Sequence, residues 1–475
     1  MTGSSTSWQP PGLRPFTTSD PGTSEAAWLA DPRWDEVPCV DPIALAADRV
    51  LVLAAHPDDE TLGVGALVAD LTAADATVDI VVATDGAASH PGSTLWSPGR
   101  LAARRRAELD HAARLLGADA HHLDLSDGDL GRDPAGLLQR LRLALPPRAE
   151  GSEVVLAPYL YDGHGDHDIL GAAAERLARE RDAELWFYPI WAWQWSTPDE
   201  LPWHRLVSVQ PSARALRRKR AAIAAHRSQV EPLSPLPGDE AMLTPEVLTR
   251  FRRVIETLVA GPDTDLPGTR EAEVERRRRR REGFDRMLDD GPDPWASTSD
   301  YERRKHELTV ALLTRRHYGE VVEVGCATGA LSARLAERAD HVTGVDGSAP
   351  ALEVARGRGL ANVAWVHGEI PYGLVDLADD SADLVVISEV AYFLTGPELL
   401  ALLRQVRRLL RDEGEVVVVD WRAGSSDLPL DGELVHDQFT TALADLGHRL
   451  TYRDDSALID VWGGRPVVPG DRGVP

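Results

Sequence analysis

The sequence is poor in cysteine and contains no long apolar run. Its 475 residues include two cysteines, Cys39 and Cys326, which lie far apart, so a disulfide framework is excluded and a reducing cytoplasm is indicated. No apolar segment approaches the roughly 18–20 residues of a membrane span. The N-terminal stretch MTGSSTSWQPPGLRPFTTSDPGTSE has neither the basic nor the apolar region of a signal peptide. We therefore expect a cytoplasmic protein without a membrane partner.

Positive charge is also scarce. The chain carries 51 Lys and Arg against 76 Asp and Glu, a formal net charge of −25. A nucleic-acid partner would require a concentrated basic surface, so we expect none. One run, ERRRRRREGF (275–284), is basic, but acidic residues flank it on both sides. We interpret it as a solvated linker helix that docks on an acidic surface, and a nucleic-acid arm is the alternative.

Two series of alternating strands and helices follow one another along the chain. In the first, apolar runs such as RVLVLAAH (49–56) and EVVLAPYL (153–160) are typical of buried parallel strands and alternate with amphipathic segments. In the second, EVVEVG (320–325) and ADLVVISEV (382–390) have the same character. The alternation predicts an α/β fold of two tandem Rossmann-like domains, each a mostly parallel sheet flanked by helices, with sites at the carboxyl ends of the strands.

These patterns divide the chain into four predicted segments. They are a disordered or loosely attached N-terminal segment (1–40), a first α/β domain (41–260), a linker with the Arg-rich helix (261–292) and a second α/β domain (293–475). Within the first domain, WFYPIWAWQWSTPDELPW (186–203) contains five tryptophans. We expect most of them to lie in a core or lid, with one or two lining a cleft, where aromatic faces stack on sugar rings.

The first candidate site follows the strand at 49–56. His56 and Asp59 lie three residues apart at the strand's carboxyl end, where a turn can point both at one ion. A catalytic Zn²⁺ site uses three protein ligands and keeps one position for water. The third ligand should come from YDGHGDHD (161–168), which follows another strand and offers His164, Asp166 and His167. A further carboxylate beside the metal could take a proton from the water.

These residues carry a resemblance to a known family. AHPDDE (55–60) and HGDH (164–167), together with TDG (84–86), RRAELDHAARLLGA (105–118) and AHRSQ (225–229), resemble the PIG-L/LmbE-type zinc deacetylases, which remove an acyl group from an amino sugar. The resemblance covers roughly residues 49–255. It implies that zinc, or another divalent metal, is bound by His56, Asp59 and His167. It implies further that Asp58 is the general base, that His164 is a cation that stabilises the oxyanion, and that Asp166 orients a histidine.

The second candidate site is a nucleoside-binding turn. VVEVGCATGALSARLA (321–336) reads as strand, glycine-containing turn and helix, in which Gly325 and Gly329 allow a ligand to approach the backbone. Asp346 ends the next strand, where it can accept hydrogen bonds from both ribose hydroxyls, and Glu369 follows the third strand, facing the adenine edge. Glu323 before the first glycine and the ExGxxxG spacing favour S-adenosylmethionine over NAD.

The second domain resembles one group of methyltransferases more closely. DPWASTSDYERRKHELTVALL (293–313), VTGVDGSAPALEVARGR (342–358) and ADLVVISEVAYFL (382–394) are similar to the nodulation-protein-S-type N-methyltransferases, which methylate the free amine of a deacetylated chitooligosaccharide. The resemblance covers about residues 293–465. It implies that the cofactor is S-adenosylmethionine. Glu389, at the fourth strand's end, could accept a proton from the amine, and the alternative is that it only caps a helix.

Hydrolysis of an N-acyl group exposes an amine, and N-methylation consumes one. We therefore hypothesise a bifunctional enzyme that deacylates a small-molecule or oligosaccharide amino-sugar substrate and methylates an amine of the same pathway. Two alternatives remain. The two domains could be independent tailoring enzymes, with the methyl group going to an oxygen or another molecule, or the first domain could be a non-catalytic carbohydrate-binding scaffold.

Overall fold

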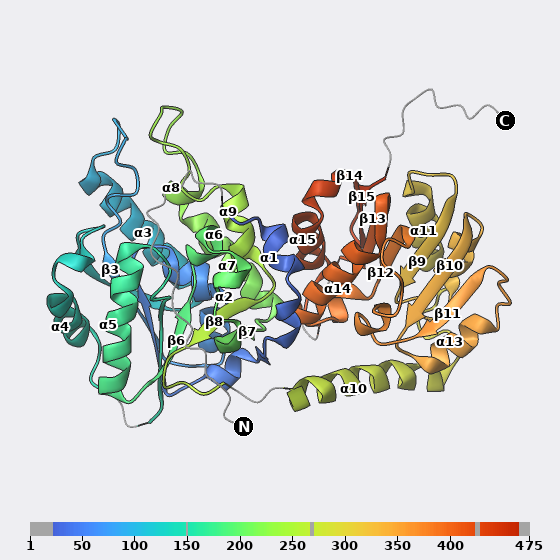
Figure 1. The fold of residues 1–475 in the computed structure, drawn as a ribbon, viewed down its shortest axis with the longest axis horizontal. Helices are drawn as coiled ribbons and strands as arrows, with labels where there is room; N and C mark the ends of the chain where they lie inside the picture. The colour runs from blue at the N-terminus through green and yellow to red at the C-terminus, as the bar shows by residue number, and fades with distance from the viewer. Residues whose placement is uncertain (1–21, 149–150, 267–269, 423–427, 465–475) are drawn as a thin grey trace. The chain divides into compact units, whose positions relative to one another are not determined.

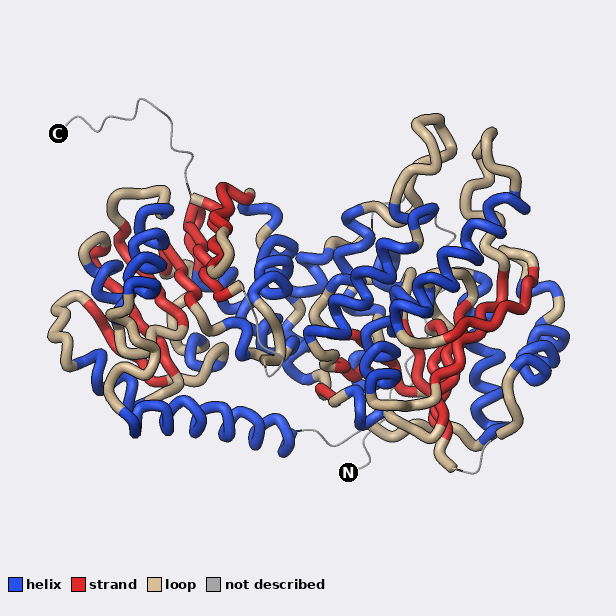
Figure 2. Tube along the Cα trace, turned by 180° about the vertical axis from the view of Figure 1, so that it is seen from behind, coloured by secondary structure: helices blue, strands red, loops and turns tan. Residues whose placement is uncertain are grey.

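The chain folds into two units with separate sheets. The computed structural model describes residues 22–148, 151–266, 270–422 and 428–464. The units comprise Met1–Thr269 and Arg270–Pro475, and both are α/β (Figures 1 and 2). The prediction of two α/β domains in tandem, each with a mostly parallel sheet, is confirmed.

The first unit is built on an eight-stranded sheet in the order β1-β7-β8-β6-β5-β2-β3-β4. Its strands are β1 (Cys39–Val40), β2 (Arg49–Ala54), β3 (Val78–Thr84), β4 (Asp119–Leu125), β5 (Glu153–Pro158), β6 (Glu184–Tyr188), β7 (Leu206–Val209) and β8 (Glu256–Ala260). The strands from β2 to β6 are parallel, and β8 runs antiparallel to both of its neighbours. Helices cover both faces of β2, which is why this strand is apolar throughout its buried length.

Two groups of helices cover the two faces of this sheet. On one face α2, α3 and α7 pack against one another, and on the other α4 packs against α5 (Figure 1). The helices are α1 (Glu25–Ala30), α2 (Asp59–Ala73), α3 (Pro98–Leu116), α4 (Pro134–Ala144), α5 (Gly165–Arg181), α6 (Ala192–Trp195), α7 (Ala213–Ala225), α8 (Arg227–Val230) and α9 (Pro245–Thr249). The two groups meet above the carboxyl ends of the parallel strands, where loops form a cavity.

The segment before β1 is part of the first unit, in contrast to the prediction for residues 1–40. The Trp28 side chain is fully buried, and its Nε1 donates to the carbonyl of Trp193 at 2.8 Å. Glu25 accepts two hydrogen bonds from the buried Arg253 guanidinium, each 2.7 Å long. The prediction of loose attachment is therefore wrong for residues 22–40, because buried tryptophans outweigh the polar composition of the stretch. Residues 1–21 lie outside the described residues.

Helix α2 is kinked, and a buried ion pair holds the kink. Val64 has φ −136° and ψ 18°, which leaves the next amides without partners inside the helix. The Glu256 carboxylate accepts from the amides of Ala66 and Leu67 at 2.8 and 2.7 Å. It also accepts from Lys219 Nζ at 2.7 Å, and both side chains of this pair are almost completely buried. The kink therefore depends on the Glu256 carboxylate, which lies on β8.

The second unit has a seven-stranded sheet in the order β11-β10-β9-β12-β13-β15-β14. Its strands are β9 (Tyr318–Val324), β10 (Ala339–Asp346), β11 (Val363–His367), β12 (Ala382–Ser388), β13 (Leu410–Trp421), β14 (His448–Arg453) and β15 (Ala457–Gly463). Its helices are α10 (Arg270–Met287), α11 (Asp300–Leu312), α12 (Ala330–Ala336), α13 (Ala349–Arg356), α14 (Gly396–Leu409) and α15 (Gly432–Ala442). Among the described strands of this second sheet, the only antiparallel pairs are β13 with β15 and β14 with β15.

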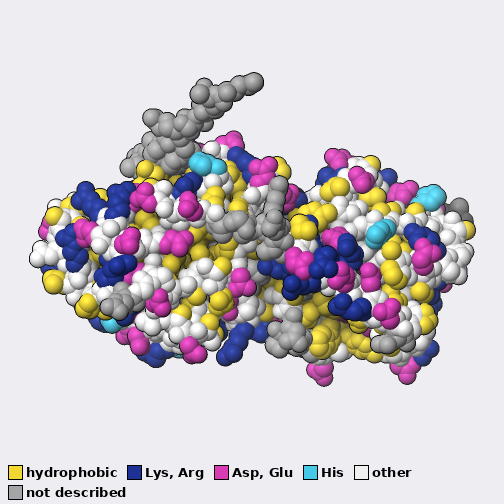
Figure 3. Space-filling view, turned by 90° about the horizontal axis from the view of Figure 1, so that it is seen from below, with side chains coloured by type: hydrophobic (Ala, Val, Ile, Leu, Met, Phe, Trp, Pro, Cys, Tyr) yellow, Lys and Arg dark blue, Asp and Glu magenta, His cyan; other side chains and the backbone are white. Residues whose placement is uncertain are grey.

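The segment predicted as a linker divides between the two units. Thr264 packs in the first unit, where its Oγ1 donates to the carbonyl of Leu185 at 2.7 Å. The arginine run forms α10 and belongs to the second unit. Along α10 basic and acidic side chains are intermixed on the face shown in Figure 3, in keeping with the ion pairs from Arg278 to Glu275 and Glu282. Residues 261–292 are therefore not one linker.

Among the described residues, we find no helix that is both long and apolar enough to cross a membrane.

Candidate active sites

The first candidate site lies where the strand order of the first sheet reverses. The chain proceeds outward from β2 to β4, then returns to β5 on the other side of β2. The loops that follow β2 and β5 consequently diverge and leave a crevice, which is the usual ligand site of such sheets. His56 and Asp59 come from the first of these loops, and His164, Asp166 and His167 from the second. The two predicted motifs, more than a hundred residues apart, meet here.

Three ligand atoms are spaced for a tetrahedral metal ion. His56 Nδ1 lies 3.2 Å from His167 Nε2, and His167 Nε2 lies 3.2 Å from Asp59 Oδ2. The third edge, from His56 Nδ1 to Asp59 Oδ2, is 3.5 Å. Ligand atoms about 2.0–2.1 Å from a tetrahedral zinc ion lie roughly 3.3–3.4 Å apart. The residues present therefore fit a zinc ion.

Carboxylates beside the outer nitrogen of each histidine ring determine which nitrogen points into the ligand triangle. His167 Nδ1 bonds to Asp162 Oδ2 at 2.7 Å, which directs the lone pair of Nε2 toward the ligand triangle. His56 Nε2 lies 3.2 Å from Asp127 Oδ1 and 3.3 Å from Asp166 Oδ2, which directs Nδ1 the same way. Asp166 therefore lies where the sequence predicted it, against a histidine, and that histidine is His56.

The backbone in turn holds Asp162 rigidly. Its two oxygens accept from the amides of Ile190, Trp191 and Ala192 at 2.8–2.9 Å. Asp162 is 1% exposed. A carboxylate held by three amides is immobile, so it can keep the His167 ring in one orientation.

Asp58 lies beside the ligand triangle and outside it. Its backbone has φ 133°, an uncommon conformation for a residue with a side chain, and Arg105 Nη2 lies 3.2 Å from its Oδ1. Burial raises the pKa of Asp58 to about 7, against the opposing effect of Arg105. Glu60, in the first turn of α2, is fully buried and accepts a hydrogen bond from Thr61 Oγ1 at 2.6 Å. Of the three consecutive acids, Asp59 belongs to the ligand triangle, Asp58 lines the cavity and Glu60 is buried in the interior.

His164 differs from its predicted charge state. Its ring centroid lies 4.8 Å from those of both His56 and His167, and its Nδ1 accepts from the amide of Asp166 at 3.3 Å. A protonated ring would place a hydrogen on Nδ1 that opposes this amide. Burial, with the two neighbouring histidines, lowers the pKa of His164 to about 4. The lowered pKa and the Asp166 amide both favour the neutral ring with its hydrogen on Nε2, whereas the sequence predicts a cation, and the charge of His164 in the working enzyme stays a prediction.

The cavity above this cluster is large and has aromatic walls. Its volume is about 640 Å³, and it is lined by Asp58, His164, Trp191 and Trp195 among other residues. The two indoles stack with centroids 5.3 Å apart and planes 6° from parallel. Trp186 and Trp193 are buried in the core instead. The tryptophan-rich segment thus divides between core and cavity.

The second candidate site lies at the corresponding reversal of the second sheet, between β9 and β12. The turn after β9 has positive φ at Gly325 (77°), Ala327 (46°) and Gly329 (74°). A Cβ at Gly325 would lie 2.7 Å from Val390 Cβ, so a side chain is excluded there. Asp346 Oδ2 accepts from the amide of Ala327 at 2.8 Å and fixes the turn against the end of β10. This arrangement suits a nucleoside, because the acid retains lone pairs for ribose hydroxyls.

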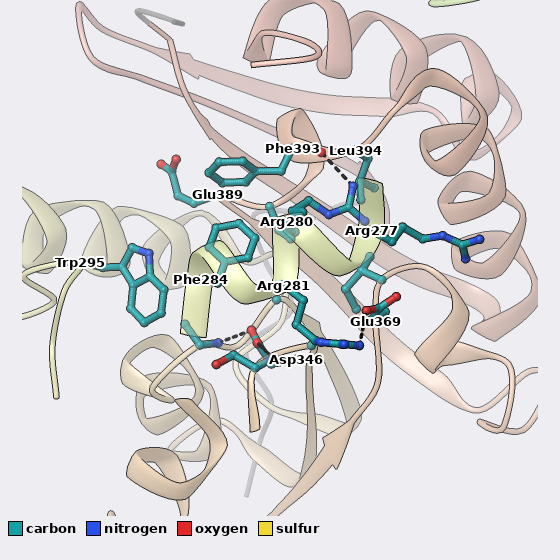
Figure 4. A pocket seen from close by; sticks show the side chains of 16 residues that line it. Arg277, Arg280, Arg281, Phe284, Trp295, Asp346, Glu369, Glu389, Phe393 and Leu394 are labelled. Carbon is teal, nitrogen blue, oxygen red and sulfur yellow. Dashed lines mark hydrogen bonds and ion pairs between the residues drawn. The ribbon is translucent and has the colours of Figure 1, made fainter. Parts of the chain in front are cut away.

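Two adjoining cavities surround this turn. One, of about 100 Å³, is lined by Gly325, Asp346, Glu369 and Trp295 among others (Figure 4). The second, of about 330 Å³, shares Gly325 and includes Glu323. Glu323 is buried beneath the turn, where it accepts from Ser332 Oγ, and burial raises the pKa of Glu323 to about 8. Gly329 caps α12, so it shapes the turn without lining either cavity.

Glu389 lies where the two cavities meet. It has φ 56°, and its carboxylate accepts from Lys305 Nζ at 2.9 Å, from the amide of Trp421 at 3.2 Å and from the Tyr392 hydroxyl. Glu389 therefore joins three segments around the cavity, which its alternative role as a helix cap does not require.

Comparison with known proteins finds relatives of both units. The family model for GlcNAc-PI de-N-acetylases, PIG-L, matches residues 51–178, and a model described as a methyltransferase domain matches residues 321–414. Diacetylchitobiose deacetylase of Thermococcus kodakarensis is 33% identical over 129 residues, which cover 26% of this chain and 46% of that protein.

The second unit has relatives among nodulation proteins. Nodulation protein S of Azorhizobium caulinodans is 30% identical over 132 residues, which cover 27% of this chain and 62% of that protein. The solved structure of the N-methyltransferase NodS from Bradyrhizobium japonicum, in complex with S-adenosyl-L-homocysteine, is 20% identical with a TM-score of 0.34, and the match covers 39% of this chain and 98% of that one. The chain spans less than two thirds of the length of the two curated relatives described.

The chain contains a PIG-L deacetylase domain and, after it, a NodS-like S-adenosylmethionine-dependent methyltransferase domain.

Sequence reasoning missed the acids that support the histidines of the deacetylase domain. Asp162 lies five residues before His167, and a carboxylate at that distance on a loop carries no recognisable spacing. Asp127 comes from the loop after β4, far away in the sequence. In the methyltransferase domain, His436 is buried, and its Nδ1 bonds to Asp460 at 2.6 Å. Only three-dimensional contact identifies these partners.

Proposed function

We propose that the deacetylase domain is zinc-dependent and hydrolyses an N-acyl group on an amino-sugar substrate. We propose further that the methyltransferase domain transfers a methyl group to an amine of the same pathway. The observation that carries the proposal is the triangle of His56, Asp59 and His167, with ligand atoms 3.2–3.5 Å apart at the floor of an open cavity.

The chain's own residues support hydrolysis of an amide. A zinc ion bound by this triangle would supply Lewis acidity, activating water and polarising the acyl carbonyl. Asp58, which lines the cavity without entering the triangle, accepts a proton from the attacking water. His164 presents its Nε2–H to the same space, where it stabilises the developing oxyanion, and the proton that Asp58 has taken passes to the leaving nitrogen. Asp166 and Asp127 hold the His56 ring in place.

Two features support an amino sugar as the substrate. Relatives of the two domains are named for diacetylchitobiose deacetylation and for nodulation, and the deacetylase relative is 33% identical. Trp191 and Trp195 bring indole rings to the cavity wall, and such rings stack on the apolar faces of pyranoses. The cavity of about 640 Å³ is large enough for more than a single monosaccharide.

Methyl transfer to an amine requires an unprotonated nitrogen held in line with the sulfonium group. Glu389 lines both cavities of the methyltransferase domain and accepts a hydrogen bond from Lys305 at 2.9 Å. We assign Glu389 the role of orienting the acceptor amine and taking its proton. Glu323, Gly325, Gly329, Asp346 and Glu369 are assigned to the cofactor.

Acetate release tests the first activity. Full-length protein is incubated with N,N′-diacetylchitobiose and larger N-acetylated chito-oligosaccharides, before and after removal of metal with a chelator. We expect turnover that disappears on chelation and returns with zinc. Asp58→Asn should retain zinc, measured by elemental analysis, and lose about 10²–10⁴-fold in kcat. A protein that holds no metal, or an Asp58→Asn variant with full activity, would contradict the proposal.

A second experiment tests whether the two activities are sequential. The acetylated and the deacetylated oligosaccharides are each supplied with S-adenosylmethionine, and methylated product is measured by mass spectrometry. We expect Asp58→Asn to block methylation of the acetylated compound only. Equal methylation of both compounds by this variant would instead support two independent tailoring activities.

A further inference from the structure

A buried lysine lies in the larger of the two cavities described for the methyltransferase domain. Lys305, on α11, lines this cavity of about 330 Å³ and is 3% exposed. Its Nζ donates to Glu302 Oε1 at 2.7 Å and to Glu389 Oε1 at 2.9 Å. The same nitrogen lies 5.0 Å from the centroid of the Tyr301 ring. Burial of an ammonium group between two carboxylates is unfavourable unless the three charges are closely paired, as they are here.

Glu389 connects this lysine to the ligands of the domain. The smaller cavity is lined by Asp346 and Glu369, the acids assigned to the nucleoside, and by Glu389. The larger cavity is lined by Glu389 and Lys305. An adenosine held by the two acids leaves the larger cavity for the rest of the cofactor and for the acceptor amine. Lys305 therefore faces the space in which the amine is methylated.

One oxygen of Glu389 remains available to a ligand. Its Oε2 accepts from the amide of Trp421 at 3.2 Å and from the Tyr392 hydroxyl, which takes up the usual capacity of a carboxylate oxygen. Among the residues that the structure describes, Oε1 accepts a hydrogen bond from Lys305 alone. An amine that bonds to Glu389 therefore shares Oε1 with Lys305, and two donors on one oxygen lie about 4–5 Å apart.

The charges around Oε1 decide whether the amine binds in its protonated form. The carboxylates of Glu302 and Glu389 favour an ammonium ion, which has no lone pair and cannot attack a methyl group. Lys305 opposes them, because it stays charged: burial lowers its pKa, but Glu389 and Glu302 raise that pKa further, to above its ordinary value.

The remaining titratable groups near Lys305 and Glu389 add little charge. They are Tyr301 and His306 of α11, Glu323 of β9, Tyr392 in the loop after β12, and Asp420 of β13. Burial raises the pKa of each acid and tyrosine in this set and lowers the pKa of His306 to about 4. All five are thus held toward their uncharged forms, which leaves Lys305 as the positive charge that counts.

We propose that Lys305 is a positioning residue that makes the site select the unprotonated acceptor amine: because it shares Glu389 Oε1 with the amine, its ammonium group disfavours a second positive charge there. The neutral amine donates one hydrogen to Oε1 and keeps its lone pair for the methyl carbon. Its nitrogen bonds to that carbon as the carbon–sulfur bond breaks, with the electron pair left on sulfur. The ammonium product then gives one proton to Glu389, which passes it to solvent. This inference rests on the proposed methylation of an amine.

The pH dependence of kcat tests the proposal, because its acid limb reports groups in the enzyme–substrate complex. Full-length protein is assayed with S-adenosylmethionine and the fully deacetylated disaccharide of glucosamine. Lys305→Met should move the acid limb up by about one pH unit, which makes kcat about tenfold lower on the acid side. Lys305→Arg keeps the positive charge and should retain the wild-type limb. Superimposable limbs for Lys305→Met and the wild type would overturn the proposal.

Two further variants separate charge from structural support. Glu302→Gln removes an opposing negative charge, and its amide oxygen can still accept from Lys305, so it should move the acid limb in the other direction, to lower pH. Arg304→Gln, at the next position of α11 to Lys305, breaks an exposed pair with Asp454 and is the matched control, with no expected shift. Shifts of the same sign in Glu302→Gln and Lys305→Met would refute the electrostatic role of Lys305.

A bound product reports the amine itself, without turnover. The disaccharide carrying an N-[¹³C]methyl group is bound together with S-adenosylhomocysteine, and the ¹³C shift of its methyl group is titrated by NMR. This measurement follows the proton on the bound nitrogen and not the proton on Glu389. The pKa of the bound amine should be about one unit higher in Lys305→Met than in the wild type. Equal values would overturn the proposal, since Lys305 would then act on Glu389 only.

Calorimetric binding of S-adenosylhomocysteine completes the test. All variants should bind it with the affinity of the wild type, which shows that each is folded. A loss of affinity confined to Lys305→Met would assign the lysine to the cofactor and overturn the proposal. A wild-type protein that binds S-adenosylhomocysteine and methylates no amine would overturn the proposed function itself, whereas methylation with an unshifted Lys305→Met limb would overturn only the role of Lys305.

Discussion

At the scale of single residues, the deacetylase site depends on which nitrogen of each histidine carries hydrogen. His56 presents Nδ1 to the ligand triangle and His167 presents Nε2. Each choice is made by an acid behind the ring, Asp127 with Asp166 for His56 and Asp162 for His167. The ligands are therefore arranged before any ion arrives, which reduces the cost of organising the site.

Asp162→Asn should lower zinc affinity about 10–100-fold. The single remaining oxygen is needed by the amides of Ile190 and Ala192, so the new amide nitrogen faces His167 Nδ1. That contact favours the tautomer with hydrogen on Nε2, which cannot bind a metal. Zinc competition against a fluorescent chelator measures the change. Asp168→Asn, one residue beyond His167, retains an acceptor for the Gly163 amide and is the matched control. Unchanged affinity in Asp162→Asn would refute the role of Asp162.

In the methyltransferase domain, Glu323 should make stability depend on pH. Burial raises its folded-state pKa from 4.5 to about 8, so the folded protein binds a proton that the unfolded chain has released. Stability should therefore fall as pH rises from about 4.5 to 8, by a few kcal/mol at most. Glu323→Gln, which imitates the protonated acid, should flatten the decline without cofactor. Thermal melts across this range measure it, with Glu320→Gln on the same strand as the control, and parallel wild-type and Glu323→Gln curves would contradict it.

At the scale of secondary-structure elements, α2 joins the proposed metal site to the interior. Its first residue is Asp59, a proposed ligand, and its kink at Val64 is held by Glu256 of β8. Glu256 accepts two amide hydrogen bonds and pairs with Lys219 of α7. The position of Asp59 is thus secured from the far side of the helix.

Glu256→Ala should destabilise the deacetylase domain by about 3–5 kcal/mol, because it leaves a buried ammonium group and two amides without partners. The double variant Glu256→Leu with Lys219→Met should recover part of this loss, since it removes both charges. Chemical denaturation of the deacetylase transition measures both. Glu180→Ala, which breaks a solvent-exposed pair with Arg142, should leave the midpoint unchanged. A Glu256→Ala variant as stable as the wild type would show that the kink needs no such support.

The sequence predicts the strand–helix alternation and the residues at the strand ends better than it predicts which segments pack against each other. His56, Asp59 and His167 are recognisable because each follows an apolar strand directly. The attachment of residues 22–40 depends on Trp28 reaching Trp193, and the position of α10 depends on acids about a hundred residues away. Composition alone therefore predicts a loosely attached tail for residues 22–40 and a linker for α10, because neither pattern encodes a distant partner.

At the scale of the whole molecule, each unit has its own sheet and its own candidate site. The deacetylase site lies between the ends of β2 and β5, and the methyltransferase site between those of β9 and β12. Both are reversals of strand order, so one topological rule positions two unrelated chemistries. Since the two cores are separate, we expect two unfolding transitions, each responding to its own ligand.

Removal of metal should lower one transition only. The three carboxylates of Asp58, Asp59 and Glu60 are crowded in a buried turn, and a divalent cation offsets their repulsion. A ligand at 1,000 times its dissociation constant contributes about 4 kcal/mol, which corresponds to a shift of roughly 10 °C for a domain of this size. Calorimetry before and after chelation should show the deacetylase transition falling by this amount. S-adenosylhomocysteine should raise the other transition and leave the first in place. If chelation moved neither transition, the acids would have to be accommodated without a metal.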